Sequence, residues 1–131
     1  MPPFPITQNV TFLYCHDLKA TLPFYRDVLG LEQVVDQGAC VIFRASPTGY
    51  VGICSRANRA VEPKGVVYTF VTPDVDGWYA YLHQKGVKTD GAPGYSDEFR
   101  VYAFFAFDPS GYRLEFQEFR DSQWQPGCSD C

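Results

Sequence analysis

Long apolar runs and basic runs are both missing from this chain of 131 residues. No stretch approaches the roughly 20 consecutive apolar residues that cross a membrane, so a membrane protein is not expected. The formal net charge is −4, and without a basic cluster the chain has no electrostatic footprint for nucleic acid. Residues 1–6 lack the basic and apolar regions of a signal peptide. These absences predict a cytoplasmic protein.

The chain has only five cysteines, an odd number, and it is large enough to fold without disulfide bonds. We therefore expect reduced thiols. Cys128 and Cys131 form a C-x-x-C pair, but neither a second such pair nor a histidine pair accompanies it to complete a zinc site. Its position in a polar terminus favours a frayed tail, and the sequence assigns the pair no role.

Aromatic residues, in contrast, are plentiful: they make up 17% of the chain, with 11 Phe and 9 Tyr. A chain of this length that is 46% hydrophobic can bury roughly two-thirds of its unfolded surface. The aromatic side chains therefore fit a bulky β-rich core, and they equally fit the lining of a pocket for a flat or apolar ligand. Both interpretations stay open at this point.

Two segments of the chain repeat one another. The apolar run 10–15 leads to Asp17 and a helical stretch, and the run 66–71 leads in the same way to Asp74. The offset between the two aspartates is 74 − 17 = 57. The same correspondence pairs Gly30 with Gly86 and residues 47–50 with 109–112. A repeat of this length predicts two equivalent halves with a cavity between them.

The periodicity of the apolar residues and the positions of the turn-forming residues predict the order βαβββ in each half. Strands are expected at 10–15, 32–36, 39–45 and 50–55, and again at 66–72, 87–90, 100–107 and 112–119. The first helix ends at Gly30; Asp17 is a plausible N-cap, but Pro23 favours a start near Thr21. The second helix ends at Gly86. Segment 88–99 is either a surface loop or a lid over the cavity.

Two motifs resemble those of one protein family. Residues 17–31 are similar to the "D-L-x-x-S-x-x-F-Y-x-x-x-L-G-L" signature of the vicinal oxygen chelate superfamily, which includes glyoxalase I, extradiol dioxygenases, fosfomycin-resistance enzymes and bleomycin-resistance proteins. Residues 107–115 resemble its "F-x-D-P-x-G-x-x-x-E" signature with the aromatic residue shifted by one place. The resemblance covers about residues 8–119. One fold of this kind hosts many chemistries.

The resemblance implies an α+β fold in which two tandem βαβββ modules form a mixed, curved sheet around a cavity, with helices outside. It places module 1 at about 8–56 and module 2 at about 65–119, in a single domain spanning 1–131 with a tail at 120–131. Relatives of the bleomycin-resistance type act as dimers, so a homodimer is implied as well.

The resemblance also implies a divalent metal, held by residues at fixed distances from the two motifs. Carried onto this chain, the ligand positions hold Val10, Val67, Ile53 and Glu115. A catalytic metal needs about three nitrogen or oxygen donors, which one carboxylate among three aliphatic residues does not supply. His16 and His83 are expected at the surface. We therefore predict no cofactor, and a divalent metal is the alternative if the alignment is displaced.

Strand alternation predicts what such a cavity would contain. If Glu115 faces inward, Arg113 and Gln117 do too, while Leu114 and Phe116 pack under the helices. Arg113 could neutralise Glu115; a Glu115 without that partner could hold a cationic ligand or act as a general base. The predicted ligand-binding residues are Phe12, Tyr14, Ile53, Ser55, Thr69, Arg113, Glu115 and Gln117, in a cup that also includes Val10, Val67 and Val71.

Two functions from different classes fit this cup. The first is a metal-free binder of a small, partly aromatic molecule, as the resemblance to bleomycin-resistance proteins implies. The second is a lyase, isomerase or dioxygenase of the same superfamily, with a rearranged metal site or a catalytic Glu115 assisted by Tyr14. A cysteine nucleophile is less favoured, because Cys15 and Cys54 are predicted to point away from the cup.

Overall fold

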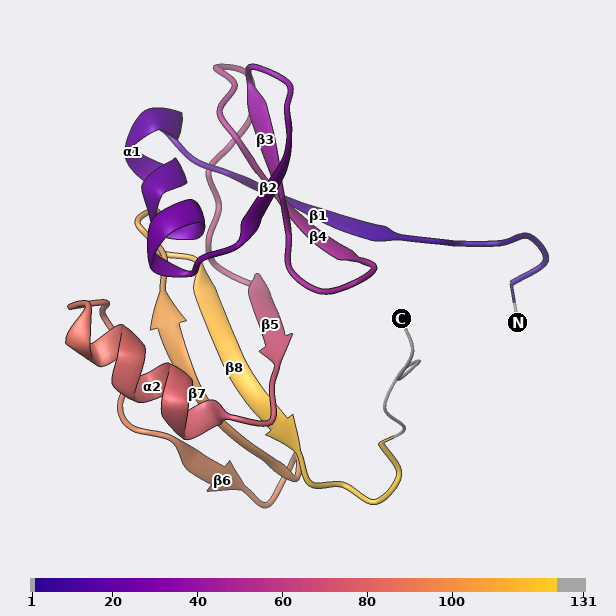
Figure 1. Cartoon of the computed structure of the whole chain (residues 1–131), viewed down its shortest axis with the longest axis vertical. Coiled ribbons are helices and arrows are strands. Elements are labelled where there is room, and N and C mark those ends of the chain that lie inside the picture. Colours follow the sequence, from indigo (N-terminus) through magenta and orange to yellow (C-terminus); the bar gives the residue numbers. More distant parts are fainter. Residues whose placement is uncertain (1, 125–131) are drawn as a thin grey trace. The chain divides into compact units, whose positions relative to one another are not determined.

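The computed structural model describes residues 2–124, which form two compact units that meet in sequence at Glu62 and Pro63. Each unit contains one open, four-stranded mixed sheet (Figure 1). The strand orders are β1-β4-β3-β2 and β5-β8-β7-β6, so the second sheet repeats the first. The α+β class and the two tandem βαβββ modules are thereby confirmed. A cavity between the units stays a prediction.

The first unit follows the expected order of elements. These are β1 (Asn9–Tyr14), α1 (Leu18–Pro23), the π-helical turn η1 (Phe24–Val28), β2 (Glu32–Asp36), β3 (Cys40–Arg44) and β4 (Gly49–Cys54). β1 pairs in parallel with β4, while β3 is antiparallel to both β2 and β4.

The start of α1 differs from the prediction. Asp17 is the N-cap, because its Oδ1 accepts a hydrogen bond from the backbone N–H of Ala20 at 3.2 Å, so the helix begins before Thr21. Pro23 is the last residue of α1, and the chain widens directly after it into η1, where Leu29 N–H donates to the Phe24 carbonyl at 2.9 Å. The missing proline N–H is thus accommodated by a change of helix type.

The core of the first unit lies between its sheet and the helical segment. The strand register places Leu13, Val41, Phe43, Val51 and Ile53 on one face of the sheet, and all of them are buried. The ring of Tyr25, which is fully buried in η1, stacks on Phe43 with 6.1 Å between ring centroids. This face of the sheet therefore packs against the helical segment and is buried in the core.

The second unit consists of β5 (Val67–Val71), α2 (Val75–Gln84), β6 (Gly94–Ser96), β7 (Val101–Phe107) and β8 (Arg113–Phe119). The prediction of a strand at 87–90 is wrong, because this stretch forms only an isolated β-bridge between Thr89 and Ala106. The edge strand β6 is supplied instead by segment 88–99, past Gly91 and Pro93. No helix among residues 2–124 has both the length and the apolarity that a membrane crossing requires.

The turn between β7 and β8 fixes how these strands pair. Asp108 is buried, and its Oδ1 accepts hydrogen bonds from the backbone N–H groups of Ser110 and Tyr112, both at 2.9 Å. Gly111 adopts a φ of 94°, which favours glycine. With the turn set in this way, Phe105 lies opposite Glu115 in the antiparallel pair.

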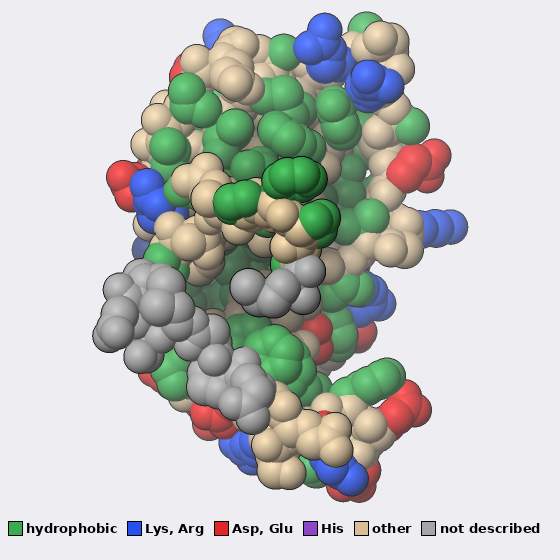
Figure 2. All heavy atoms as spheres, turned by 90° about the vertical axis from the view of Figure 1, so that its right-hand side faces the viewer, with side chains coloured by type: hydrophobic (Ala, Val, Ile, Leu, Met, Phe, Trp, Pro, Cys, Tyr) green, Lys and Arg blue, Asp and Glu red, His purple; other side chains and the backbone are tan. Residues whose placement is uncertain are grey.

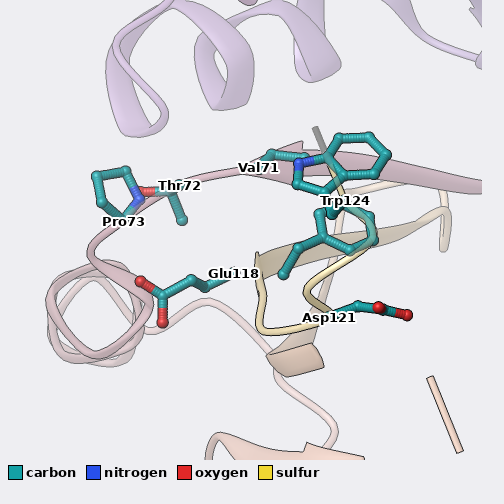
Figure 3. Close-up of a pocket in the computed structure, with 7 residues that line it drawn as sticks. Val71, Thr72, Pro73, Glu118, Asp121 and Trp124 are labelled. Carbon is teal, nitrogen blue, oxygen red and sulfur yellow. The ribbon is translucent and has the colours of Figure 1, made fainter. Parts of the chain in front are cut away.

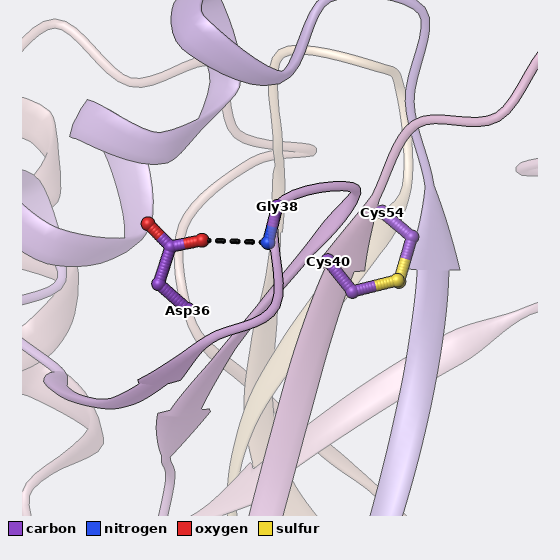
Figure 4. The surroundings of a disulfide bond; sticks show 4 residues. All are labelled: Asp36, Gly38, Cys40 and Cys54. Carbon is purple, nitrogen blue, oxygen red and sulfur yellow. Dashed lines mark hydrogen bonds between the residues drawn. A yellow bond between two sulfur atoms is a disulfide. The ribbon is translucent and has the colours of Figure 1, made fainter.

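Two of the cysteines are joined, contrary to the expectation of reduced thiols. Cys40 and Cys54 lie directly opposite each other on β3 and β4, with 4.1 Å between their Cα atoms, and form a disulfide (Figure 4). Asp36 shapes the turn before Cys40 by accepting a hydrogen bond from Gly38 N–H at 2.8 Å. Cys15 is buried outside this bond, and Cys128 and Cys131 lie outside the described residues.

The disulfide gives a stability prediction. It closes a loop between residues 14 apart in sequence, so reduction is expected to lower the free energy of unfolding by about 2–3 kcal/mol. Urea unfolding with and without dithiothreitol measures this change, and peptide mass spectrometry without reductant identifies the linked pair. The Cys40→Ser/Cys54→Ser variant is the control, since its stability should not respond to the reductant. Equal wild-type stability in both conditions would contradict the assignment.

Candidate functional site

The second sheet has one face covered by α2 and one open face. On the covered side, Trp78 and Tyr79 of α2 contact Phe116 and Phe104, with ring centroids 5.0 and 5.3 Å apart. Tyr68 lies on this side too, and burial raises the pKa of its phenol, so the group is neutral at physiological pH.

The opposite face carries four of the residues predicted to bind ligand. In the parallel pair of β5 and β8, Val67, Thr69 and Val71 lie opposite Arg113, Glu115 and Gln117 respectively. The prediction that these side chains share a face is confirmed by this register. That the face binds a ligand stays a prediction.

A cavity of about 450 Å³ opens on this face. We call it the second-sheet cup; its lining residues are Val67, Thr69, Phe99, Val101, Phe105, Glu115, Gln117 and Phe119. Most of these side chains are apolar or aromatic. Figure 2, which looks at the molecule from the right-hand side of Figure 1, shows hydrophobic side chains exposed to solvent, with most charged ones toward the edges of the view.

The charged residues of this face do not pair with each other. Glu115 accepts a hydrogen bond from the Thr69 hydroxyl at 3.0 Å. Arg113 instead forms an ion pair with Asp90 at 3.1 Å, and its guanidinium lies over the ring of Phe105, 5.3 Å from the centroid. Arg113 and Glu115 therefore do not neutralise each other, and the Glu115 side chain lines the cup with Thr69 as its hydrogen-bond donor.

Gln117 supplies a second acceptor in the cup. The side chain is 7% exposed, and its Oε1 has no hydrogen-bond partner among residues 2–124. A buried polar atom without a partner costs about 1–3 kcal/mol, so a group that donates a hydrogen bond to it would recover that energy. Gln117 also lines the cup, so this unsatisfied acceptor lies in the wall of the cavity.

The first sheet also has a face turned away from its helix, but different residue types lie on it. Val10, Phe12 and Tyr14 lie opposite Tyr50, Gly52 and Cys54, so these side chains share the face away from α1. Cys54 is therefore on this face, contrary to the prediction that it points away from it. Tyr14 is half-buried.

Ile53 and Ser55 were expected beside Phe12, and the structure corrects this. Ile53 is 1% exposed and lies opposite Leu13, in the core under α1. Ser55 follows β4 and donates a hydrogen bond from its hydroxyl to the His16 carbonyl at 3.1 Å. The prediction is wrong by one residue, because the first half has one residue fewer between its turn and the matching strand position.

The counterpart of Glu115 in the first half is consequently Gly52. Glu115 lies opposite Thr69, five residues before Asp74, and Gly52 lies opposite Phe12, five residues before Asp17. A Cβ atom on Gly52 would lie only 2.5 Å from Cδ1 of Phe12. The Phe12 ring thus covers the position where the other half has a carboxylate.

These residues do not fit the divalent metal that the family resemblance implies. The positions that would hold it carry Val10, Val67, Gly52 and Glu115, which is one carboxylate without an imidazole. No group of three or more His, Cys, Asp and Glu side chains in the described part of the chain is arranged to hold a metal ion. A catalytic metal site needs about three such donors. His83 is exposed on α2, where its ring stacks on Tyr79.

A second cavity in this unit, of about 370 Å³, lies beside the end of β8. Trp124 stacks on Phe119 there, with 3.8 Å between ring centroids. Figure 3 shows the carboxylates of Glu118 and Asp121 pointing away from each other, and each pairs with an arginine, Arg120 and Arg100 respectively. The two acids therefore do not converge on a cation.

Four residues of the second-sheet cup were missed by sequence reasoning. Phe119 continues the alternation of Arg113, Glu115 and Gln117, so the same count could have found it. Phe105 could be placed only once the β7–β8 pairing was known, because alternation within β7 does not say which residue faces Glu115. Val101 is the first residue of β7 and lies opposite Phe119, so it too needed the β7–β8 pairing, whereas Phe99 comes from the β6–β7 connection, for which the sequence carries no periodic signal.

The two open sheets with their repeated strand order define a vicinal oxygen chelate type of fold. Among solved structures, the chain is similar to a lactoylglutathione lyase from Agrobacterium tumefaciens, with a TM-score of 0.74 and 25% identity over 95% of this chain and 100% of that one. For a superfamily protein from Sphaerobacter thermophilus the TM-score is 0.75 and the identity 20%, over 87% of this chain and 98% of that one. For oxidase ChaP-H2 the TM-score is 0.70 and the identity 22%, over 91% of this chain and 98% of that one.

The model of the Glyoxalase/Bleomycin resistance protein/Dioxygenase superfamily matches residues 7–116, and the chain belongs to that superfamily. No curated protein matches the sequence.

The surroundings of Arg113 predict a structural role for this side chain. Arg113→Met removes the ion pair with Asp90 and the contact of the guanidinium with Phe105, so we expect a loss of about 1–2 kcal/mol in the free energy of unfolding. Asp90→Asn removes the exposed ion pair alone and should cost less than about 1 kcal/mol. Urea unfolding of both variants measures the difference; equal costs would show that the ring contact contributes nothing.

Proposed function

We propose that this protein binds a small, partly aromatic molecule in the second-sheet cup, without a metal. The observation that carries the proposal is an apolar, aromatic cavity of about 450 Å³ whose wall includes Glu115 and Gln117, the latter with a buried Oε1 that has no hydrogen-bond partner among residues 2–124. Ligand sites of small molecules have this composition, a mostly apolar lining with a few polar groups that fix orientation. Membership of the superfamily supports a small-molecule ligand in general terms.

The polar groups define what the ligand must carry. Gln117 Oε1 and the Glu115 carboxylate are both acceptors, so the matching group is a hydroxyl or an amine that donates. An ammonium group would in addition form a charge-assisted hydrogen bond with Glu115, which has no ion pair within residues 2–124. The rings of Phe99, Phe105 and Phe119 offer surfaces on which a flat ligand can pack.

Two further properties belong to this proposal. The resemblance to bleomycin-resistance proteins implies a homodimer, which analytical ultracentrifugation would test. A cytoplasmic location is the expectation from the sequence, but the Cys40–Cys54 disulfide argues against it, since such bonds are rare in reducing compartments; the redox state of the protein in cells tests it.

Matched aromatic compounds test the proposed binding. We expect 2-naphthol and 1-naphthylmethylamine to raise the unfolding temperature, and 2-methoxynaphthalene, which has no donor, to bind at least fivefold more weakly than 2-naphthol. In Gln117→Leu the preference for naphthol over its methyl ether should largely disappear, because the acceptor is gone. Thermal shift and calorimetric titration measure both effects.

Gln84→Leu is the matched control, since Gln84 is exposed on α2 and remote from the cup. It should bind all three compounds as the wild type does. Failure of every compound to bind the wild type, or an unchanged preference in Gln117→Leu, would contradict the proposal.

The second candidate is an enzyme of the superfamily, a lyase, isomerase or dioxygenase, in which Glu115 acts as a general base or a rearranged site holds a metal. Two observations favour it: the Glu115 carboxylate is held by Thr69 in a cavity, and one similar structure is named a lactoylglutathione lyase. Tyr14 belongs to the first unit, and its part in catalysis stays a prediction.

Turnover of lactoylglutathione and of catechols, with and without divalent metals, tests this candidate. If Glu115 is the base, Glu115→Gln should lower kcat by at least 100-fold. Glu118→Gln is the control, since Glu118 pairs with Arg120 and does not line the cup. Activity that survives in Glu115→Gln would remove this residue from the mechanism.

A further inference from the structure

A third cavity, of about 350 Å³, lies in the first unit, apart from the second-sheet cup. Its lining residues are Cys15, His16, Ser55, Arg56, Ala57, Arg59 and Val61. This set contains two guanidinium groups, an imidazole and a hydroxyl, and no carboxylate. None of these side chains belongs to the two family motifs or to the second-sheet cup.

The cavity forms where two parallel strands end. β1 ends at Tyr14 and β4 at Cys54, and the residues that follow them are held together: Cys15 N–H donates to the Cys54 carbonyl at 2.8 Å, and the Ser55 hydroxyl donates to the His16 carbonyl at 3.1 Å. In open α/β sheets the carboxyl ends of parallel strands are the usual place for ligands. The disulfide at Cys54 further fixes this strand end to β3.

A turn brings the two arginines to the same cavity. Arg59 N–H donates to the Arg56 carbonyl at 3.2 Å, so the chain reverses between them and both side chains line the cavity. Neither guanidinium has a hydrogen bond or an ion pair within residues 2–124. The remaining arginines all pair with carboxylates: Arg26, Arg44, Arg100, Arg113 and Arg120.

Arg56 and Arg59 are exposed to solvent, and neither pairs with an acid within residues 2–124, although the chain has more acids than bases. It carries 15 Asp and Glu against 11 Lys and Arg, yet none of the acids among residues 2–124 lines this cavity. Asp17, the neighbour of His16, accepts a hydrogen bond from Ala20 N–H at the start of α1 and does not line it. Within the described part of the chain, no carboxylate therefore compensates the positive charge of this cavity.

We infer that this cavity binds the oxyanion group of a small molecule, a carboxylate or a phosphate, between Arg56 and Arg59. A guanidinium presents planar N–H donors that match both groups in a two-point contact, and two of them with an imidazole give a site for a dianion. The overall charge of −4 disfavours a polyanion such as nucleic acid, so the ligand is a small one.

Inorganic phosphate and succinate serve as the probes, titrated into the full chain at constant ionic strength with chloride as the reference salt. We expect saturable stabilisation by at least one of them. The Arg56→Gln/Arg59→Gln variant should bind that anion at least tenfold more weakly, with each single variant in between. Arg26→Gln is the matched control, because Arg26 pairs with its neighbour Asp27 outside the cavity and should bind as the wild type does.

The two probes separate the possible ligands: stronger binding of phosphate points to a phosphorylated molecule, and stronger binding of succinate to a carboxylic acid. Stabilisation by neither anion, or equal binding by the wild type and the double variant, would overturn the inference. Amide chemical shifts of residues 55–59 provide a second readout, which should move on titration in the wild type and stay fixed in the double variant.

Discussion

The packing of α2 on one face of the second sheet is the interaction on which the proposed site depends. Phe116 is buried at the centre of this contact, with the rings of Phe70, Trp78 and Phe104 at centroid distances of 5.0 to 5.2 Å. Because successive side chains of a strand point to opposite faces, burying Phe116 under the helix directs Glu115 and Gln117 to the open face. A slip of one residue would exchange the two sets.

The same constraint acts in the first unit with a different result. Tyr25 and Phe43 commit Ile53 to the core, which leaves Gly52 on the open face beneath the Phe12 ring. The two halves therefore share a fold but not a surface chemistry. The second presents acceptors in an aromatic cavity, whereas the first presents Val10, and Gly52 beneath the Phe12 ring, at the positions where a metal-binding relative would be expected to have ligands.

Sequence reasoning succeeded where a periodic signal was strong. The alternation along 113–117 and the repeat of Asp17 and Asp74 were enough to predict the fold and one face of the second sheet. It failed where the answer depends on pairing between distant segments. Ile53 was misplaced by one residue, and the Cys40–Cys54 bond was not expected. Both follow from the pairing register of β3 and β4, which cannot be read from the sequence.

The central claim is that a metal position of the family fold has become an apolar cup with hydrogen-bond acceptors. Elemental analysis of protein purified without added metal or chelator tests it most directly, together with thermal shift against Mn²⁺, Zn²⁺, Ni²⁺ and Fe²⁺. The account predicts metal far below one equivalent and no stabilisation by any of these ions. Near-stoichiometric metal with a matching rise in unfolding temperature would contradict it, since a ligand that binds the native state must stabilise it.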